Sequence, residues 1–194
     1  MGAYVAKKWE VALGSVAGMT GPGTLLWTTA TPALVAEPVA AALAGWPPAA
    51  QVLAAPIDDS LADTADFCAA YEVSPADSAN CVVIAGRRGE VTRYAACVVL
   101  ATTRADVNNV VRKRLDARKA SFAPMGEAVS LSGMEYGGIT PIGIPADWAL
   151  YIDQAVLKRD IVIVGSGLRR SKIALPAALL AELPNAEVVE GLAN

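Results

Sequence analysis

The sequence predicts one compact domain of the α+β (mixed α/β) class. Segments with the patterns of strands and of helices are intermixed along the chain, without the regular alternation that produces a parallel sheet. The length of 194 residues suits one ordinary domain and is enough to bury a sizeable core. Although 54% of the residues are hydrophobic, proline, glycine or charge interrupts each apolar run well before the roughly 20 residues that a membrane span needs.

Five helices are predicted from cap residues and from periodic apolar positions. Residues 1–23 have only a weak pattern and are expected to form an N-terminal extension, with the domain following over 24–194. A proline in the first turn begins one helix, an Asp-Asp-Ser run caps the next, and a threonine with an aspartate three residues later begins the third. Gly133 stands where a C-terminal cap ends the fourth. The expected helices are 38–43, 61–71, 104–117, 127–132 and 176–183.

Short apolar runs bounded by turn residues predict the strands. The runs 81–85 and 94–101 are separated by the basic segment 86–90 and are expected to form a hairpin. The turn Gly165-Ser166-Gly167 is not a dinucleotide-binding fingerprint, because the pattern after it is that of a strand instead of a helix. The remaining expected strands are 51–57, 149–152, 161–164, 168–175 and 187–189.

The sequence contains no histidine, which is the firmest chemical statement that its composition allows. This excludes histidine-containing catalytic triads, histidine general bases and histidine-ligated zinc. The cysteines Cys68, Cys81 and Cys97 stand far apart and are expected to be buried, reduced thiols of a cytoplasmic protein. Neither the cysteine spacing nor the carboxylates form a recognisable metal site, so no metal and no cofactor are expected.

A cluster of basic residues lies in the predicted helix 104–117 and just after it. Its members are Arg112, Lys113, Arg114, Arg118 and Lys119. The formal net charge of the chain is −3, so contact with a nucleic acid would have to be local. Two interpretations are open for the cluster: a solvated helix face, or a patch that follows nucleic-acid phosphates and gains salt-dependent affinity from each of them.

The segment Met134–Pro145 is expected to be a shaped loop. It contains Gly137, Gly138, Gly143 and two prolines, a density that excludes both a long helix and a central strand. Adjacent glycines let the backbone adopt positive φ and let a ligand approach bare peptide N–H donors. The residues alone leave open whether the loop is a tight connection or a binding loop.

The residues 131–144 resemble the Gly-Tyr-x-x-Gly-Gly-x-x-Pro-Phe-Gly segment of the YbaK/EbsC family of prolyl-tRNA-editing-like aminoacyl-tRNA deacylase domains. Three further segments match the family in the same order: 118–122, 151–153 and 165–170. The similarity is strongest over 55–191. It implies a fold like that of the YbaK/ProRS-associated domain, with a mixed, barrel-like sheet and surrounding helices.

The resemblance implies a trans-acting editing hydrolase. Its partner would be the 3′ acceptor end of a mischarged tRNA, with an aminoacyl-tRNA synthetase as a second possible partner and no membrane. Substrate-assisted attack would make a protein general base unnecessary, which fits the absence of histidine. The resemblance assigns Gly137 and Gly138 to the oxyanion and the carbonyl, and Asp153 to the α-ammonium or a bound water. Residues implied to contact the substrate are Thr140, Pro141, Ile142, Gly143, Ser166 and Gly167, and those implied to contact tRNA are Arg87, Arg88 and the basic cluster.

Asn80 stands where the family usually has a lysine, and Ile142 replaces the phenylalanine of the loop. Asn80 is placed among the catalytic residues by this correspondence, and asparagine can hydrogen-bond a phosphate or carbonyl oxygen but brings no charge. Either Arg87, Arg88 or the basic cluster supplies a cation from elsewhere, or the chain has changed substrate or lost catalysis. The alternatives are therefore a non-catalytic module that binds aminoacyl-tRNA or a small ligand, and an unrelated α/β domain in which the Gly-Gly loop is a turn.

Overall fold

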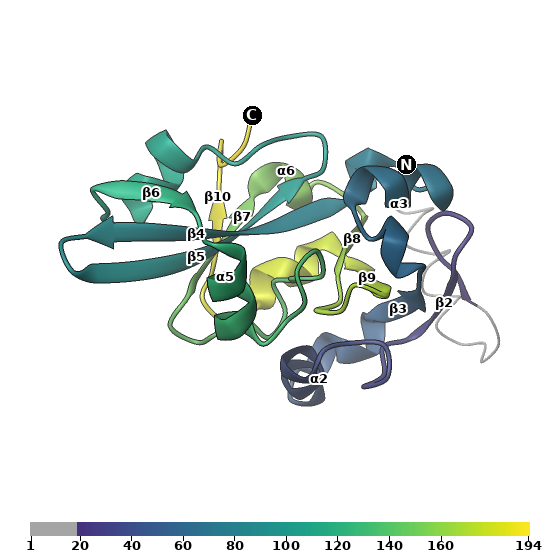
Figure 1. Ribbon diagram of the computed structural model, residues 1–194. Coiled ribbons are helices and arrows are strands. Elements are labelled where there is room, and N and C mark those ends of the chain that lie inside the picture. The colour runs from purple at the N-terminus through teal and green to yellow at the C-terminus, as the bar shows by residue number, and fades with distance from the viewer. Residues whose placement is uncertain (1–18) are drawn as a thin grey trace.

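The computed structural model describes residues 19–194, which fold into two five-stranded sheets with short helices around them (Figure 1). The predicted α+β class is confirmed, but the sheet is not closed into the expected barrel. Of the predicted extension, residues 1–18 lie outside the described part of the chain. Strand β1 (Met19–Thr20) belongs to the first sheet, where it pairs with β2 (Leu26–Thr29).

The first sheet is antiparallel throughout and has the order β1-β2-β3-β9-β8. Its other strands are β3 (Leu53–Pro56), β8 (Ile161–Gly165) and β9 (Ser171–Pro176). Strand β9 lies between β3 and β8, so the C-terminal third of the chain completes a sheet that the N-terminal third begins. Residues of β9 therefore come next to segments far away in the sequence.

The second sheet is mixed and has the order β10-β7-β5-β4-β6. Its strands are β4 (Ala79–Arg88), β5 (Val91–Leu100), β6 (Lys119–Phe122), β7 (Ala149–Asp153) and β10 (Ala186–Val189). Strand β7 is parallel to both of its neighbours, and the other pairs are antiparallel. The two sheets meet where Ser78, just before β4, bridges to Ile163 of β8. Buried residues of both sheets share one core, which makes the described chain a single unit.

Four of the five predicted helices are present as α-helices, two of them shorter than expected, whereas the segment predicted over 176–183 forms a 3₁₀ helix. The helices are α2 (Glu37–Ala44), α3 (Thr64–Ala70), α4 (Arg112–Arg114), α5 (Met125–Ser132) and α6 (Gln154–Leu157). A π-helical turn, Val107–Val111, leads into α4. The 3₁₀ turns are η1 (Pro47–Gln51), η2 (Asp59–Leu61), η3 (Pro75–Asp77) and η5 (Ala177–Glu182). As predicted, Gly133 caps α5 in the left-handed conformation, with φ 67°.

The helix predicted over 104–117 begins later because the C-terminal tail occupies its expected first turn. Arg104 exchanges two backbone hydrogen bonds with Asn194, and the N–H of Asp106 donates to the carbonyl of Leu192. The Asp106 carboxylate instead accepts from the N–H of Asn109 and caps the π-helical turn. At the other end Asp116 has φ 50°, a left-handed conformation that stops a helix.

Candidate functional site

A cavity of about 750 Å³ opens between the Gly-Gly loop, α3, the first half of β4 and the start of α5. Its walls come from both sheets, since Gly165 and Lys172 of the first sheet face residues 79–83 of the second. The first half of the loop, through Tyr136, Gly137 and Ile139, forms one side of it. The sequence predicted two of these lining residues as site residues, Asn80 and Gly137.

One end of the cavity is polar. Thr64, the first residue of α3, donates from its Oγ1 to Oδ1 of Asn80 at 2.6 Å. This bond fixes the orientation of the Asn80 amide and leaves its N–H donors without a partner among residues 19–194. Asn80 can therefore donate to an oxygen atom of a ligand.

Lys172 of β9 also lines the cavity, and sequence reasoning did not identify it. Only 6% of this residue is exposed, and its Nζ donates to the carbonyl of Ala62 at 2.8 Å. The ammonium also lies 5.1 Å from the centroid of the Phe67 ring. Burial lowers the pKa of Lys172 from 10.5 to about 8. A lysine inside a predicted apolar strand was the sequence signal that could have identified it.

The mouth of the cavity is apolar. Phe122, Met125 and Tyr136 line it, and they are respectively 61%, 58% and 59% exposed. Large apolar side chains that remain in water beside a cavity mark a binding surface. Aromatic faces of this kind stack on nucleic-acid bases without regard to base identity.

The two adjacent glycines of the loop have different environments. Gly137 has φ 81°, and its N–H has no hydrogen-bond partner within residues 19–194. The Gly138 N–H donates to the Glu135 carbonyl at 3.0 Å, and the Gly138 carbonyl accepts from the N–H of Gly167 at 2.7 Å. In this structure Gly137 therefore has an N–H free for a ligand, whereas that of Gly138 closes a turn.

The second half of the loop lies behind the cavity, in the core. Thr140, Pro141 and Ile142 are buried, and a Cβ on Gly143 would lie 2.4 Å from the Pro38 carbonyl oxygen of α2. Ser166 is also buried and hydrogen-bonds Ser171 between their hydroxyls at 2.7 Å. The six residues expected to contact substrate are thus absent from the cavity wall, namely Thr140, Pro141, Ile142, Gly143, Ser166 and Gly167. Five of the six are buried and Gly143 is partly buried, so they support the loop from behind instead of facing the cavity.

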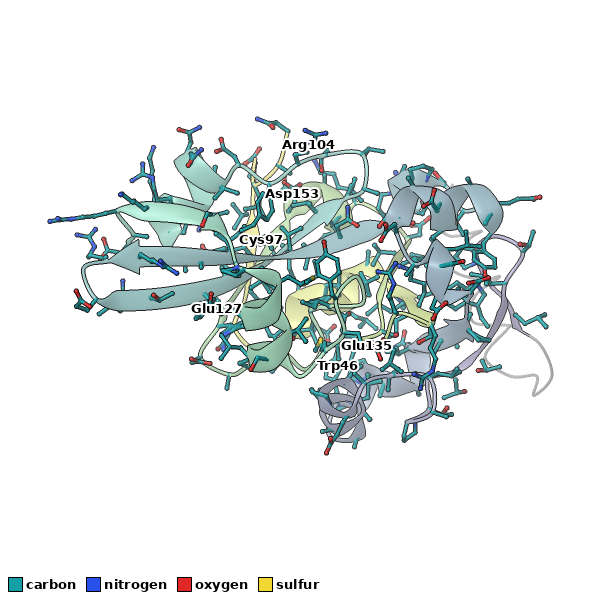
Figure 2. The ribbon with its side chains drawn as sticks, viewed as in Figure 1. Trp46, Cys97, Arg104, Glu127, Glu135 and Asp153 are labelled. Atoms are coloured by element: carbon teal, nitrogen blue, oxygen red, sulfur yellow. The ribbon has the colours of Figure 1, made fainter. Side chains whose placement is uncertain are left out.

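Asp153 does not reach the cavity either. It is 5% exposed at the end of β7, and its two carboxylate oxygens accept from the N–H groups of Ala155 at 2.7 Å and Ala193 at 2.8 Å. Figure 2 shows Asp153 well separated from Glu135, which lies at the start of the Gly-Gly loop. Its carboxylate caps α6 and holds the C-terminal segment, so a substrate ammonium in the cavity would not meet it.

The basic cluster lies along the edge strand β6 and beside it. Arg87 of β4 is opposite Lys119 of β6, and both are exposed. Three other cations of this region have partners: Arg88 pairs with Asp116 at 2.5 Å, Arg114 pairs with Glu187, and Arg112 donates to the Asn108 carbonyl. Strand β6 runs from Lys119 at the cluster to Phe122 at the cavity mouth. Three residue steps of a strand span about 10 Å, so the cluster and the cavity are near each other.

A family model described as an aminoacyl-tRNA editing domain matches residues 58–183. The chain belongs to this family. Among solved structures, it resembles the hypothetical protein APE2540 with 20% identity and a TM-score of 0.64, over 73% of this chain and 90% of that one. It also resembles a structure described as a candidate trans-editing enzyme for prolyl-tRNA synthetase, with 19% identity and a TM-score of 0.68, over 83% of this chain and 97% of that one. At such identities the likeness shows the fold alone. No curated protein sequence matches the chain.

Three further observations concern the residues that the structure describes. No three His, Cys, Asp or Glu side chains in 19–194 gather closely enough to hold a metal ion. Within the same range, no helix has the length and apolar character needed to cross a membrane. Burial raises the pKa of the Cys81 and Cys97 thiols, which keeps both in the protonated, weakly nucleophilic form.

Proposed function

We propose that this chain is a trans-acting aminoacyl-tRNA deacylase, which hydrolyses the ester between a mischarged amino acid and the 3′-terminal adenosine of tRNA. The chain belongs to an aminoacyl-tRNA editing family. The observation that carries the proposal is its cavity, which has hydrogen-bond donors at one end and exposed aromatic rings at the other. The ring faces suit the terminal adenine, and the donors suit the ester. The basic cluster at the other end of β6 suits the tRNA backbone.

The mechanism needs no side-chain general base. An aminoacyl ester is already activated, and a ribose hydroxyl of the terminal adenosine can relay the proton of the attacking water. The protein then contributes by positioning the ester and by donating hydrogen bonds to its carbonyl oxygen. The Gly137 N–H and the Asn80 amide are two donors without partners at the cavity. Gly138 supports the same loop through its bonds to Glu135 and Gly167.

The second candidate function is a non-catalytic module that binds aminoacyl-tRNA or a small ligand. Asn80 favours it, because this residue brings no charge to the place where the family usually has a lysine. Such a module would keep the cavity and the aromatic mouth but would not turn over its ligand. The two candidates differ in whether the bound ester is cleaved.

Asn80→Ala should lower kcat/KM about 100-fold if Asn80 donates to the reacting ester, the loss that follows removal of one oxyanion donor. The measurement is the release of amino acid from a panel of misacylated tRNAs by the wild type, by Asn80→Ala and by Asn80→Lys. Asn108→Ala, at an exposed asparagine outside the cavity, is the matched control and should retain full activity. Binding of the tRNAs without hydrolysis by any of the proteins would instead establish the binding module.

Arg87→Ala combined with Lys119→Ala should weaken tRNA binding and lower the slope of log K against log salt concentration by about 2, since two phosphate contacts are lost. Hydrolysis of a short substrate, aminoacyl-adenosine, should be unchanged because it lacks the contacted phosphates. The control is Lys158→Ala, an exposed lysine outside the cluster. An unchanged salt slope would assign the cluster to a solvated surface.

A further inference from the structure

Lys172 is a buried cation that faces an open cavity without an anionic partner. It is 6% exposed, and it forms no ion pair among the described residues. The nearby carboxylate of Asp63 is instead bridged to Arg169 at 3.6 Å. An ammonium has three N–H donors and the bond to the Ala62 carbonyl uses one of them, so two donors remain for a ligand.

Such an arrangement is unfavourable for folding alone. An ammonium that leaves water loses several kcal/mol of hydration unless a charged or polar partner compensates it. The Ala62 carbonyl and the Phe67 ring compensate only in part, since neither carries a full negative charge. Perturbed, poorly compensated ionisable groups in a cavity mark functional sites. The negative charge that Lys172 lacks in the free protein is then expected from the bound substrate.

We propose that Lys172 is a catalytic residue, whose ammonium stabilises the negative charge that develops on the carbonyl oxygen of the aminoacyl ester during hydrolysis. This inference rests on the proposed deacylase function. The side-chain amide of Asn80 and the backbone N–H of Gly137 are neutral donors of the same cavity, and Lys172 adds the positive charge that they lack.

The step that Lys172 assists is the addition of water to the ester. The water oxygen forms a bond to the carbonyl carbon, and the electron pair of the C=O double bond moves onto the carbonyl oxygen beside Lys172. When this intermediate collapses, the C=O bond re-forms and the bond to the ribose oxygen breaks. The ribose oxygen takes the proton that the water loses, so that the products are a free amino acid and tRNA with its terminal hydroxyl restored.

The position of Lys172 favours the ester over a phosphate as its ligand. The mouth of the cavity is formed by Phe122, Met125 and Tyr136, whereas Lys172 is almost fully buried. The aminoacyl ester is the tip of the tRNA and enters deepest, and the phosphates follow outside. The exposed cations available to those phosphates are on β4 and β6, at Arg87 and Lys119.

The charge state of Lys172 makes its contribution to kcat/KM depend on pH. Burial and, to a lesser extent, Arg169 lower its pKa to about 8, while Cys68 and Asp63 act in the opposite direction. Lys172 must be protonated to stabilise an oxyanion. Its contribution to kcat/KM should therefore be complete well below pH 8 and be lost as the pH rises through about 8.

The test compares Lys172→Met, Lys172→Arg and the exchanged double variant Asn80→Lys/Lys172→Met with the wild type. Lys158→Met is the matched control at an exposed lysine. Lys172→Met should lower kcat at least 100-fold with KM changed less than about threefold, the pattern for an interaction made only in the transition state. The exchanged variant, which restores a charge on the neighbouring wall, should recover part of kcat.

The affinities of two substrate analogues distinguish whether Lys172 stabilises the oxyanion or binds a phosphate of the tRNA. Lys172→Met should bind an anionic tetrahedral phosphonate analogue of aminoacyl-adenosine at least tenfold more weakly than the wild type, and should bind the neutral amide analogue equally well. A loss confined to KM, or an equal loss for both analogues, would overturn the proposal. Unchanged kcat in Lys172→Met would overturn it while the deacylase function stands, and a wild type without turnover would refute both.

Discussion

Replacing Lys172 with methionine should raise the free energy of unfolding at pH 7, even though the same change should lower kcat at least 100-fold. The pKa of Lys172 is lowered from 10.5 to about 8, mainly by burial. At 1.36 kcal/mol for each pKa unit, holding this ammonium in the folded protein costs about 3 kcal/mol. Methionine has a similar length and no charge, so it removes this cost. The lost hydrogen bond to Ala62 offsets part of the gain.

The effect should depend on pH in a defined direction. Well below pH 8 both the folded and the unfolded wild type hold the proton, and the cost is complete. Between about pH 8 and 10.5 the unfolded state binds more protons, so the stability of the wild type rises relative to that of the variant. Above pH 10.5 the advantage of the variant should vanish.

Urea unfolding of both proteins at several pH values from 7 to 10 measures this difference. Burial raises the pKa of Cys81 and Cys97, which lowers stability at alkaline pH in both proteins alike and cancels in the comparison. Lys158→Met should show no comparable gain, because its side chain is exposed. A variant that is less stable than the wild type at pH 7, or an advantage that does not change with pH, would mean that Lys172 does not carry a buried charge.

A gain in stability from the loss of a site residue is the signature of a trade-off between stability and function. The folded chain holds the Lys172 ammonium at a cost in folding free energy, and part of that cost is recovered when the oxyanion forms beside it during the reaction. Reduced stability together with reduced activity would instead point to a role in packing. The two measurements on one variant therefore separate a catalytic from a structural lysine.

Local patterns predicted much of the fold, since most of its elements are defined by neighbouring residues. The β4–β5 hairpin, α5 with its Gly133 cap, and strands β7 and β8 lie close to where the sequence placed them. Strands β1, β2 and β6 were missed, because each has at most four residues, and the polar–apolar alternation of Lys119–Phe122 in β6 is too short to indicate a strand by itself. The separation into two sheets depends on β3 pairing with β9, a contact between distant segments that no local pattern encodes.

The candidate site was harder to predict for the same reason. Asn80 and Gly137 were predicted, and both line the cavity. Asp153 was expected there because it ends a strand, but β7 ends beside α6 and the C-terminal segment. Lys172 enters the cavity only because β9 lies between β3 and β8 in the first sheet. The cavity is assembled across two sheets, so sequence order does not indicate which side chains meet.

Alanine at Gly138 should lower kcat/KM about 100-fold and reduce stability by about 1–3 kcal/mol, the usual range for overpacking. A Cβ there would lie 2.6 Å from the carbonyl carbon and oxygen of Leu168, which are backbone atoms that cannot rotate away. The Leu168 turn is itself held, since Gly167 donates to the Gly138 carbonyl and Ser166 bonds to Ser171. Either the loop or the turn must shift, and Gly137 would move with the loop.

The matched control is Gly126→Ala in α5, a helix that also borders the cavity. A Cβ at Gly126 meets nothing within 4 Å, so alanine there should keep full activity and add roughly 0.5–1 kcal/mol of stability through its helix propensity. Thermal unfolding, tRNA affinity and deacylation of one misacylated tRNA are the measurements for both variants. Gly138→Ala should still bind tRNA, because Arg87 and Lys119 lie on the β4–β6 edge and not on the loop. Full deacylation by Gly138→Ala would show that the position of the Gly-Gly loop does not control the reaction. Catalysis would then have to depend on the other walls of the cavity, around Asn80 and Lys172.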